Sequence, residues 1–397
     1  MDFFLILSIV ILFLTGLMSI HSASYARGIE GLAVKHTVWF IAGGALLYLV
    51  RFYPVKNLMS LSVLIYTVSV LLLVVVAFFG STRMGARRWL EIGPFQFQPS
   101  EIGKFGLICI LARYYSNGRL DWKDPKVYAA GLLLTAIPVI FLLKQPDLGT
   151  SVIYFAIYVS ALIASGIPGI FVFTAISLLS FVFISAAGAQ YFITAAIIFG
   201  MLLKKLSFKP SHIVILLFLA FAIGFLSGIV WDNLRPYQQI RLITFMNPEK
   251  FSTEGGWQIV QSKAAVSNGG LTGSGYRNGS QTQLGFLPEG HNDFIFSVIS
   301  EEFGVMGILV VLSAFLLFFH RLVKVVSRAG NRFLYLIGTG IISLFVFQTV
   351  LNIYVTLGML PVTGLTLPLV SYGGTAVLMN MFMIGIVSAT GVQEKST

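Results

Sequence analysis

The sequence predicts an all-α polytopic membrane protein that forms a single membrane domain over residues 1–397. Hydrophobic residues make up 57% of the chain and charged residues only 10%. A soluble domain cannot bury that share of apolar surface, because folded soluble proteins keep a substantial polar exterior. Apolar runs long enough to cross a bilayer recur along the whole sequence, which lacks the short alternating strands typical of a membrane barrel.

The apolar runs predict about twelve membrane spans, some of them short enough to be tilted or re-entrant. The runs cover residues 3–20, 37–50, 58–79, 101–115, 128–143, 150–165, 168–187, 189–203, 212–230, 294–320, 333–357 and 367–391.

Basic residues cluster in alternate loops, at Arg51 and Lys56, Arg113 to Lys126, Lys204 to Lys209 and Arg321 to Arg332. Cytoplasmic loops carry an excess of Lys and Arg, so this pattern places those loops and the N-terminus in the cytoplasm. The net charge of +11 is then partly topological, and it does not indicate nucleic-acid binding. The same count places the long polar loop 231–292 outside, and a glycine-punctuated loop of that length is typically functional.

Three arginines break this charge rule. Arg83, Arg87 and Arg88 lie in "GSTRMGARRWLEIG", on the outer side. Positive charge on the disfavoured side predicts an anionic partner such as a phosphate, with attraction to lipid head groups as the alternative.

Ionisable residues also stand inside or between the apolar runs. Glu101 and Lys104 are three residues apart, so they share a helix face and are expected to pair, with Ser100 capping the helix. Charges within membrane segments usually face a cavity, which favours function over a capping arrangement with a snorkelling lysine. Between the next two runs, Asp147 is expected to cap the following helix and Lys144 to end the previous one.

The last apolar run is interrupted by two prolines, several glycines and Ser371, in "LGMLPVTGLTLPLVSYGGTAVL". A broken helix persists in a membrane only where protein or a water-filled cavity satisfies its freed backbone groups. We therefore expect a cavity on the outer side at this point.

Asp293 stands where the long polar loop meets the apolar run that begins at Phe294. It is expected either to cap that helix or to act as a general base at the membrane surface, and His291 is an alternative base. Glu301 and Glu302 follow about two turns later, as buried acids that need partners. Within the long loop, residues 256–266 are expected to form a short interfacial helix.

Five motifs, in order and over nearly the whole chain, resemble the SEDS family (shape, elongation, division and sporulation). They are "GARRWLEIG…FQPSEIGK", "KQPDLGTS", "GWQIVQSKAAVSNGGLTGSG", "GSQTQLGFLPEGHNDFIFSVISEEFG" and "GMLPVTGLTLPLVSYGGTA". The stretches "NGSQTQLGFLPE" and "LPVTGLTLP" are closest to the elongation branch of this family rather than to its division branch.

The resemblance implies a peptidoglycan glycosyltransferase that polymerises lipid II into β-1,4-linked glycan strands at the outer face of the bacterial cytoplasmic membrane. The donor is an α-linked undecaprenyl-pyrophosphate glycan, so the reaction inverts the anomeric centre. The family's essential aspartate corresponds to Asp293, which would deprotonate the acceptor hydroxyl. The residues expected to bind substrate are Arg83, Arg87, Arg88, Glu101, Lys104, Lys144, Asp147, Gln258, Gln261, Lys263, Glu289, His291 and Ser371.

The resemblance also implies a class B penicillin-binding protein as partner, beside the membrane lipids. The sequence requires no cofactor and shows no dedicated carboxylate cage for a metal, while a divalent cation such as Mg²⁺ or Mn²⁺ would suit a pyrophosphate leaving group.

The sequence departs from the family pattern in two places. Family members commonly have ten spans, and the surplus of two predicted here falls in residues 167–209, as an added hairpin. Gly290 and Asn292 stand beside the acid where the family often has a bulkier residue and a threonine, which bears on acceptor affinity.

Two other functions fit part of the pattern, namely a lipid II flippase and a scaffold for a cell-wall synthase. An acid at the outer lip favours chemistry over transport, because a transport site belongs nearer the membrane midplane.

Overall fold

The computed structural model describes residues 2–83, 86–93, 95–117, 125–167, 189–205 and 256–393, with a few residues between 213 and 221. The chain divides into two compact units, one made of Met1–Ala161 with Arg241–Thr397 and the other of Leu162–Ile240. The predicted span 168–187 and most of the predicted span 212–230 lie outside the described residues, as does the first part of the long loop.

The described residues form ten helices of 17 residues or more. They are α1 (Phe3–Ala26), α2 (Leu32–Val50), α3 (Leu58–Phe79), α4 (Pro99–Ser116), α5 (Pro125–Lys144), α6 (Leu148–Ala164), α8 (Ala189–Lys205), α13 (Ile295–Val326), α14 (Arg332–Thr356) and α15 (Gly374–Gln393). Among the described residues, six helices (α1, α2, α3, α5, α13 and α14) are long and apolar enough to cross a membrane. The predicted class of helical membrane protein is confirmed, and the total number of spans stays a prediction.

Shorter elements connect these helices. They are the 3-10 helix η1 (Val55–Asn57), the strands β1 (Ser81–Arg83), β2 (Ala86–Ile92) and β3 (Phe95–Phe97), and the helices α11 (Trp257–Asn268) and α12 (Ser280–Gln283). Helix α11 confirms the short helix expected within the long loop.

The three strands form one antiparallel sheet in the order β1-β2-β3, which the sequence analysis did not predict. Successive side chains of a strand point to opposite faces, so the neighbours Arg87 and Arg88 on β2 diverge. Arg87 is exposed, whereas the Arg88 side chain is only 15% exposed. The sheet therefore turns the Arg88 side chain towards the interior and leaves Arg87 at the surface.

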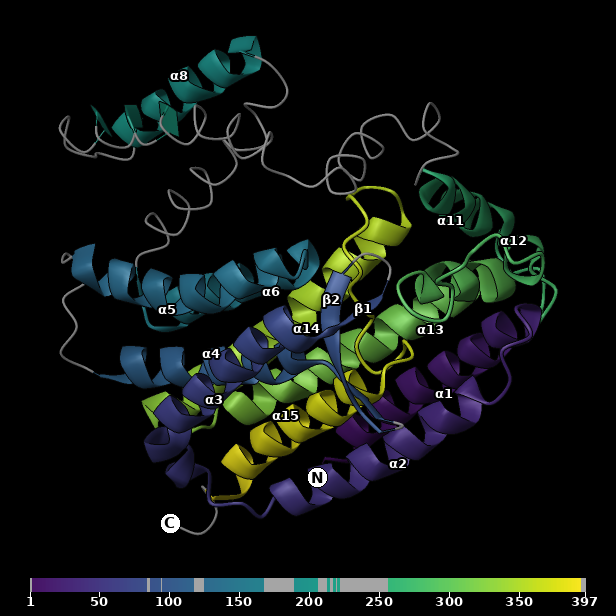
Figure 1. Ribbon diagram of the computed structural model, residues 1–397, viewed down its shortest axis with the longest axis horizontal. Coiled ribbons are helices and arrows are strands. Elements are labelled where there is room, and N and C mark those ends of the chain that lie inside the picture. Colours follow the sequence, from purple (N-terminus) through teal and green to yellow (C-terminus); the bar gives the residue numbers. More distant parts are fainter. Residues whose placement is uncertain are drawn as a thin grey trace. The chain divides into compact units, whose positions relative to one another are not determined.

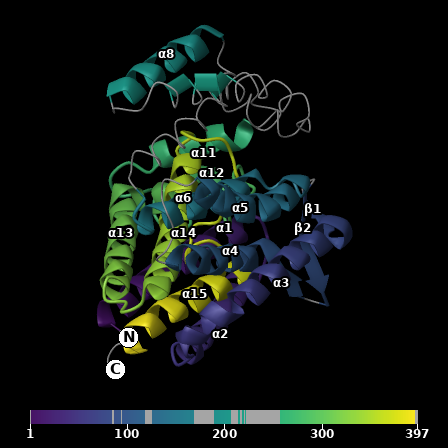
Figure 2. The same cartoon turned by 90° about the vertical axis from the view of Figure 1, so that its left-hand side faces the viewer.

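The first unit is a bundle in which several closely packed helix pairs are distant in sequence. Helix α2 packs along α15, α1 packs along α13, and α14 contacts both α4 and α13, while the sequence neighbours α3 and α4 pair directly. Figure 1 and Figure 2 show the yellow α15 beside the purple α2, and α1 beside the green α13. The C-terminal helix α15 is thereby packed mainly against the second helix of the chain.

Helix α13 is broken at Gly304, whose φ of 61° and ψ of −157° are accessible to glycine but strained for other residues. The break frees backbone groups that pair with the loop after α11. The amides of Val305 and Met306 donate to the carbonyls of Gly270 and Leu271, at 3.0 and 3.2 Å. On the other side of the break, the carbonyls of Glu301 and Glu302 accept from the amides of Ser274 and Gly275, at 2.9 and 3.0 Å, so the loop after α11 contacts both parts of α13.

Buried apolar residues anchor the start of α13. Phe294 is fully buried and packs in a cluster that unites α1, α11, α13 and α14, comprising Ala23, Ala265, Leu287, Phe294, Val298 and Val355. The residue before Phe294 is Asp293, so this packing fixes the position at which the predicted base leaves the loop.

The second unit has a small core of its own, formed by Phe192, Ala196, Phe199, Leu203 and Ala220. It overlaps the predicted extra hairpin of residues 167–209, and the domain organisation stays a prediction.

Candidate active site

The segment that carries Asp293 is fastened by three consecutive backbone carbonyls. The His291 carbonyl accepts from the Tyr372 amide at 3.0 Å, and the Asn292 carbonyl accepts from the Ser371 hydroxyl at 2.7 Å. The Asp293 carbonyl accepts from Asn352 Nδ2 at 2.8 Å. Two remote parts of the chain, α14 and the loop before α15, therefore set the position of the aspartate.

Asp293 does not cap the helix that follows it. Helix α13 begins at Ile295, and its N-cap residue is Phe294 rather than Asp293. The capping alternative for Asp293 was wrong, and so was the expected cap by Ser100, because α4 begins at Pro99 with Gln98 as N-cap. In both cases the local composition resembled a cap, but the chain enters the helix one or two residues away from the expected position.

The Asp293 carboxylate and the Arg88 guanidinium face the same small space beside Gly364. A methyl group on Gly364 would lie 3.4 Å from Arg88 Nη1 and 3.7 Å from Asp293 Oδ2. The Gly364 backbone has a φ of +73°, in the left-handed region that favours glycine. The loop before α15 thus places a glycine, which has no side chain, next to both the Asp293 carboxylate and the Arg88 guanidinium.

A second acid, Asp147, completes this charged group. Its Oδ1 lies 3.6 Å from Arg88 Nη1, and its side chain is only 1% exposed. Asp147 also accepts from the amide and the hydroxyl of Thr150, at 3.2 and 2.8 Å, so the predicted cap of α6 is confirmed. Arg88 donates further to the Pro146 carbonyl. The arginine is therefore oriented by one carboxylate and one carbonyl, and it reaches towards a second carboxylate.

The predicted pair of Glu101 and Lys104 forms, with 2.6 Å between Glu101 Oε1 and Lys104 Nζ, and both side chains are buried. Lys104 also donates to Gln348 Oε1 at 3.4 Å, and Gln348 Nε2 donates to the Thr366 carbonyl at 3.0 Å. The ion pair thereby connects α4 through α14 to the same loop that holds Gly364.

One face of α14 carries the polar residues that the sequence analysis missed. Gln348, Asn352 and Thr356 are four residues apart and fully or almost fully buried. Asn352 Nδ2 donates to the carbonyls of both Asp293 and Leu365, at 2.8 and 2.7 Å. Uncharged polar residues at helical spacing inside an apolar run were the available signal, since buried polar groups require partners.

Glu301 and Glu302 have structural partners rather than a place beside Asp293. Glu301 accepts from the amides of Gln281 and Thr282, at 2.6 and 3.0 Å, and so caps the start of α12. Glu302 accepts from the hydroxyl of Ser22 on α1. Glu301 thus connects α13 to α12, and Glu302 connects it to α1.

The other predicted site residues lie on the loop before Asp293, on α11, at the end of α5 and in the sheet. Glu289 accepts from Asn292 Nδ2 at 2.8 Å, and Lys263 is exposed on α11, with its aliphatic chain beside Gly358. Lys144 is exposed at the end of α5, with its ammonium 6.0 Å from the centre of the Phe141 ring. The remaining predicted residues are Gln258 and Gln261, which are half-buried on α11, exposed Arg87, and Arg83, whose side chain is not described.

His291 lies close to Asp293 in sequence, but its ring faces Tyr372, with 6.2 Å between the ring centres. Burial lowers the pKa of His291 below its usual 6.5, with an opposing effect from Glu289 and a smaller lowering from Arg27. The ring is therefore neutral at pH 7. Within the described ranges, no three His, Cys, Asp or Glu side chains are grouped closely enough to hold a metal ion.

Fold and site together define a polytopic helical membrane protein in which Asp293, Arg88 and Asp147 form a charged group beside Gly364. A family model described as cell cycle protein, covering FtsW, RodA and SpoVE, matches residues 3–197 and 178–396. The chain belongs to this family.

Similar proteins carry enzyme names. The chain is 30% identical to peptidoglycan glycosyltransferase RodA of Treponema pallidum, with 99% of this chain and 98% of the relative covered. It is 33% identical to peptidoglycan glycosyltransferase MrdB of Escherichia coli, over 83% of this chain and 78% of the relative.

Solved structures show the same fold. One belongs to a study of how a peptidoglycan synthase complex coordinates polymerization and crosslinking, and it matches with a TM-score of 0.75 and 27% identity over 100% of this chain and 99% of that chain. The rod shape determining protein RodA of Thermus thermophilus matches with a TM-score of 0.64 and 25% identity, over 99% of this chain and 97% of that chain.

Proposed function

We propose that this protein is a peptidoglycan glycosyltransferase that polymerises lipid II during cell elongation, with Asp293 as its general base. The observation that carries the proposal is the placement of the Asp293 carboxylate and the Arg88 guanidinium next to the same glycine, Gly364. The relatives named peptidoglycan glycosyltransferase RodA and MrdB support the reaction class.

The proposed reaction is a single displacement with inversion. Asp293 removes the proton from the acceptor sugar's 4-hydroxyl as that oxygen attacks the anomeric carbon of the donor. The bond from this carbon to the undecaprenyl pyrophosphate breaks, and its electron pair leaves with the phosphate. Arg88 is the cation placed to stabilise the charge that develops there, which is the kind of preorganised stabilisation that lowers barriers most.

The buried partners of these two groups have positioning roles. Asp147 orients Arg88, and Asn352 holds the Asp293 backbone. Lys104, paired with Glu101, supports the Gly364 loop through Gln348. No step of this proposal is assigned to a divalent cation, and activity with and without Mg²⁺ or Mn²⁺ tests that dependence directly.

A class B penicillin-binding protein is the proposed partner, at the outer face of the cytoplasmic membrane. The similarity to a chain from a peptidoglycan synthase complex supports this assignment. Polymerisation by this chain would then supply glycan strands for the partner to cross-link.

Labelled lipid II in detergent micelles tests the proposal, because micelles offer no second leaflet into which a lipid could be moved. The purified protein is assayed with and without its penicillin-binding partner, and glycan chains are resolved on a gel. Polymer from the partnered protein is the expected result. Translocation of lipid II in vesicles with no polymer in micelles would instead favour the flippase. The absence of both activities would favour the scaffold.

A further inference from the structure

A cavity of about 410 Å³ lies at the end of the bundle remote from Asp293. It is lined by Leu49, Val50, Tyr53, Leu58, Leu61, Ile65, Phe105, Phe382 and Ile386, from the ends of α2 and α3 and from α4 and α15. Leu58 begins α3, whereas the sheet that carries Arg88 follows the other end of that helix, 22 residues on. Because the cavity is lined along α3 from Leu58 to Ile65, at 1.5 Å per residue it lies about 20–30 Å from the sheet along that helix.

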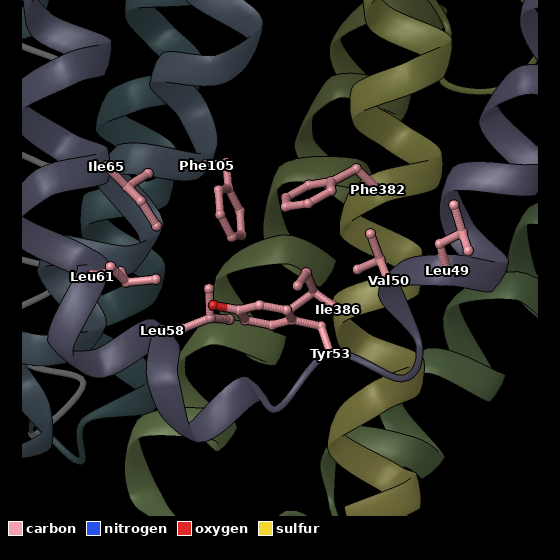
Figure 3. Close-up of a pocket in the computed structure, with 9 residues that line it drawn as sticks. All are labelled: Leu49, Val50, Tyr53, Leu58, Leu61, Ile65, Phe105, Phe382 and Ile386. Atoms are coloured by element: carbon pink, nitrogen blue, oxygen red, sulfur yellow. The ribbon is translucent and has the colours of Figure 1, made fainter.

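The walls of this cavity are apolar apart from the Tyr53 hydroxyl. Figure 3 shows Phe105 and Phe382 above the Tyr53 ring, with Leu61 and Ile65 on one side and Val50 on the other. Its base is closed, because Leu58, Phe105 and Ile386 are 3%, 3% and 1% exposed. Its rim reaches the surface, since Leu49 is 68% exposed.

Water is a poor occupant for such a space, since it needs two to four polar partners that these walls do not offer. At roughly 30 Å³ for a water-sized group, the cavity has room for about a dozen methylenes. Two of the helices that border it, α2 and α3, are apolar and long enough to span a membrane, so acyl chains are the molecules available at its rim. The cavity therefore matches one hydrocarbon chain in size and chemistry.

Two guanidinium groups mark the same end of the bundle. Arg51 follows the lining residue Val50 in the sequence and comes two residues before the lining residue Tyr53. Its Nε is buried without a hydrogen-bond partner. Arg113 donates to the carbonyl of Met59, the neighbour of lining Leu58, at 2.7 Å. Positive charge beside an apolar cavity complements a lipid with an anionic head group and a hydrocarbon tail.

We propose that this cavity binds one acyl chain of an anionic phospholipid, from the leaflet opposite to the Asp293 site, with its phosphate held by Arg51. The chain would fill the space under the edge-on pair of Phe105 and Phe382, whose ring centres are 5.0 Å apart. Phe105 follows Lys104 on α4, and Phe382 lies on α15. A bound lipid therefore stabilises the packing of these two helices directly below the buried ion pair.

Native mass spectrometry of the full chain tests this assignment, with phosphatidylglycerol and phosphatidylcholine of identical acyl chains as probes. The wild type is expected to retain one phosphatidylglycerol, with about a fivefold preference over phosphatidylcholine, the factor that one basic side chain near a charged lipid contributes. Arg51→Gln should reduce that preference to nearly one. Equal retention of both lipids by the wild type would overturn the proposal.

A matched pair of variants on α3 locates the chain. Ile65→Trp fills the cavity and should abolish retention, whereas Leu64→Trp places the same side chain on a residue that is 59% exposed and outside the lining. Should Ile65→Trp fail to fold, the smaller change Leu61→Phe serves in its place. Undiminished retention in a folded cavity-filling variant would overturn the proposal, as would a wild type that forms dimers across this face instead of binding lipid.

Thermal unfolding supplies a readout that does not depend on glycan synthesis. Phosphatidylglycerol should raise the Tm of the wild type and of Leu64→Trp, but not that of Ile65→Trp, because a ligand stabilises only the state that binds it. Failure of this shift would contradict the lipid site and leave the proposed transferase reaction unaffected.

Discussion

Asn352 donates a 2.8 Å hydrogen bond from its side-chain amide to the backbone carbonyl of Asp293, although 59 residues separate the two. The same amide nitrogen donates to the Leu365 carbonyl at 2.7 Å. A single side chain of α14 therefore binds the two segments that bring the acid and Gly364 together. The geometry of the site depends on this asparagine more directly than on any residue next to Asp293 in the sequence.

Replacing Asn352 by Leu should lower polymerisation and stability together. The change leaves the carbonyls of Asp293 and Leu365 without this donor, at a cost of about 1–3 kcal/mol for each that stays buried. Rates of glycan synthesis and the Tm in the same detergent measure the two effects. Thr349→Val is the matched control, because Thr349 is buried on the same helix and its hydroxyl has no hydrogen-bond partner. Equal activity of both variants would argue against a positioning role for Asn352.

Gly364→Ala is expected to impair catalysis more than folding. The added methyl group would occupy space next to both Arg88 Nη1 and Asp293 Oδ2, the two groups proposed to act on the substrates. Its left-handed backbone would also cost an alanine about 1–2 kcal/mol. Gly270→Ala separates the two effects, because Gly270 also has a positive φ but no atom lies within 4 Å of its added methyl group. A Gly364→Ala protein as active as Gly270→Ala would contradict the placement.

The Glu101–Lys104 pair should be sensitive to loss of either partner and tolerant of losing both. Lys104→Met leaves the buried carboxylate of Glu101 uncompensated, which costs about 3–5 kcal/mol in comparable pairs. The double variant Glu101→Gln with Lys104→Met removes both charges and should recover much of the Tm. A double-mutant cycle measures the coupling, and additive losses would show that the two charges do not interact.

The loop before α15 should loosen as the pH falls. Burial lowers the pKa of His291 in the folded protein, so between that value and 6.5 the unfolded chain binds more protons. Stability from the neutral ring is complete above pH 6.5 and is lost as the pH falls through this window. Hydrogen exchange at the Tyr372 amide, which donates to the His291 carbonyl, reports on the loop. His291→Gln should remove the pH dependence of this exchange. An unchanged pH profile in that variant would show that another group causes the dependence.

Much of the fold could be predicted because a helix that crosses a membrane requires a long run of apolar residues, which is visible in the sequence. The ten long helices in the described residues overlap runs that were read from hydropathy alone, and the pairing of Glu101 with Lys104 follows from helical spacing. The three-stranded sheet was missed, since β1 and β3 are only three residues long and arise from a hairpin rather than from a marked alternation. Without the sheet, the sequence offered no reason to prefer Arg88 over Arg87.

The sequence identified most of the residues of the candidate site, but it did not predict which of them contact one another. Asp293, Arg88 and Asp147 were all selected, but their grouping depends on a loop that returns from residues 357–373. Gln348 and Asn352 were overlooked because uncharged polar residues in an apolar run give a weak signal next to buried charges. Their importance comes from tertiary contacts to backbone carbonyls, which no local pattern reveals.

The central claim is that Asp293 acts in the chemical step, and a single-turnover measurement on Asp293→Asn tests it most directly. Lipid II binding and the rate at which the first glycosidic bond forms are measured separately in the partnered protein. Asp2→Asn is the matched control, because the Asp2 carboxylate of the wild type contacts Arg321. The account predicts binding close to wild type and a rate lower by about 10²–10⁴-fold, the usual contribution of a general base. A variant that binds lipid II and forms the bond at the wild-type rate would contradict it.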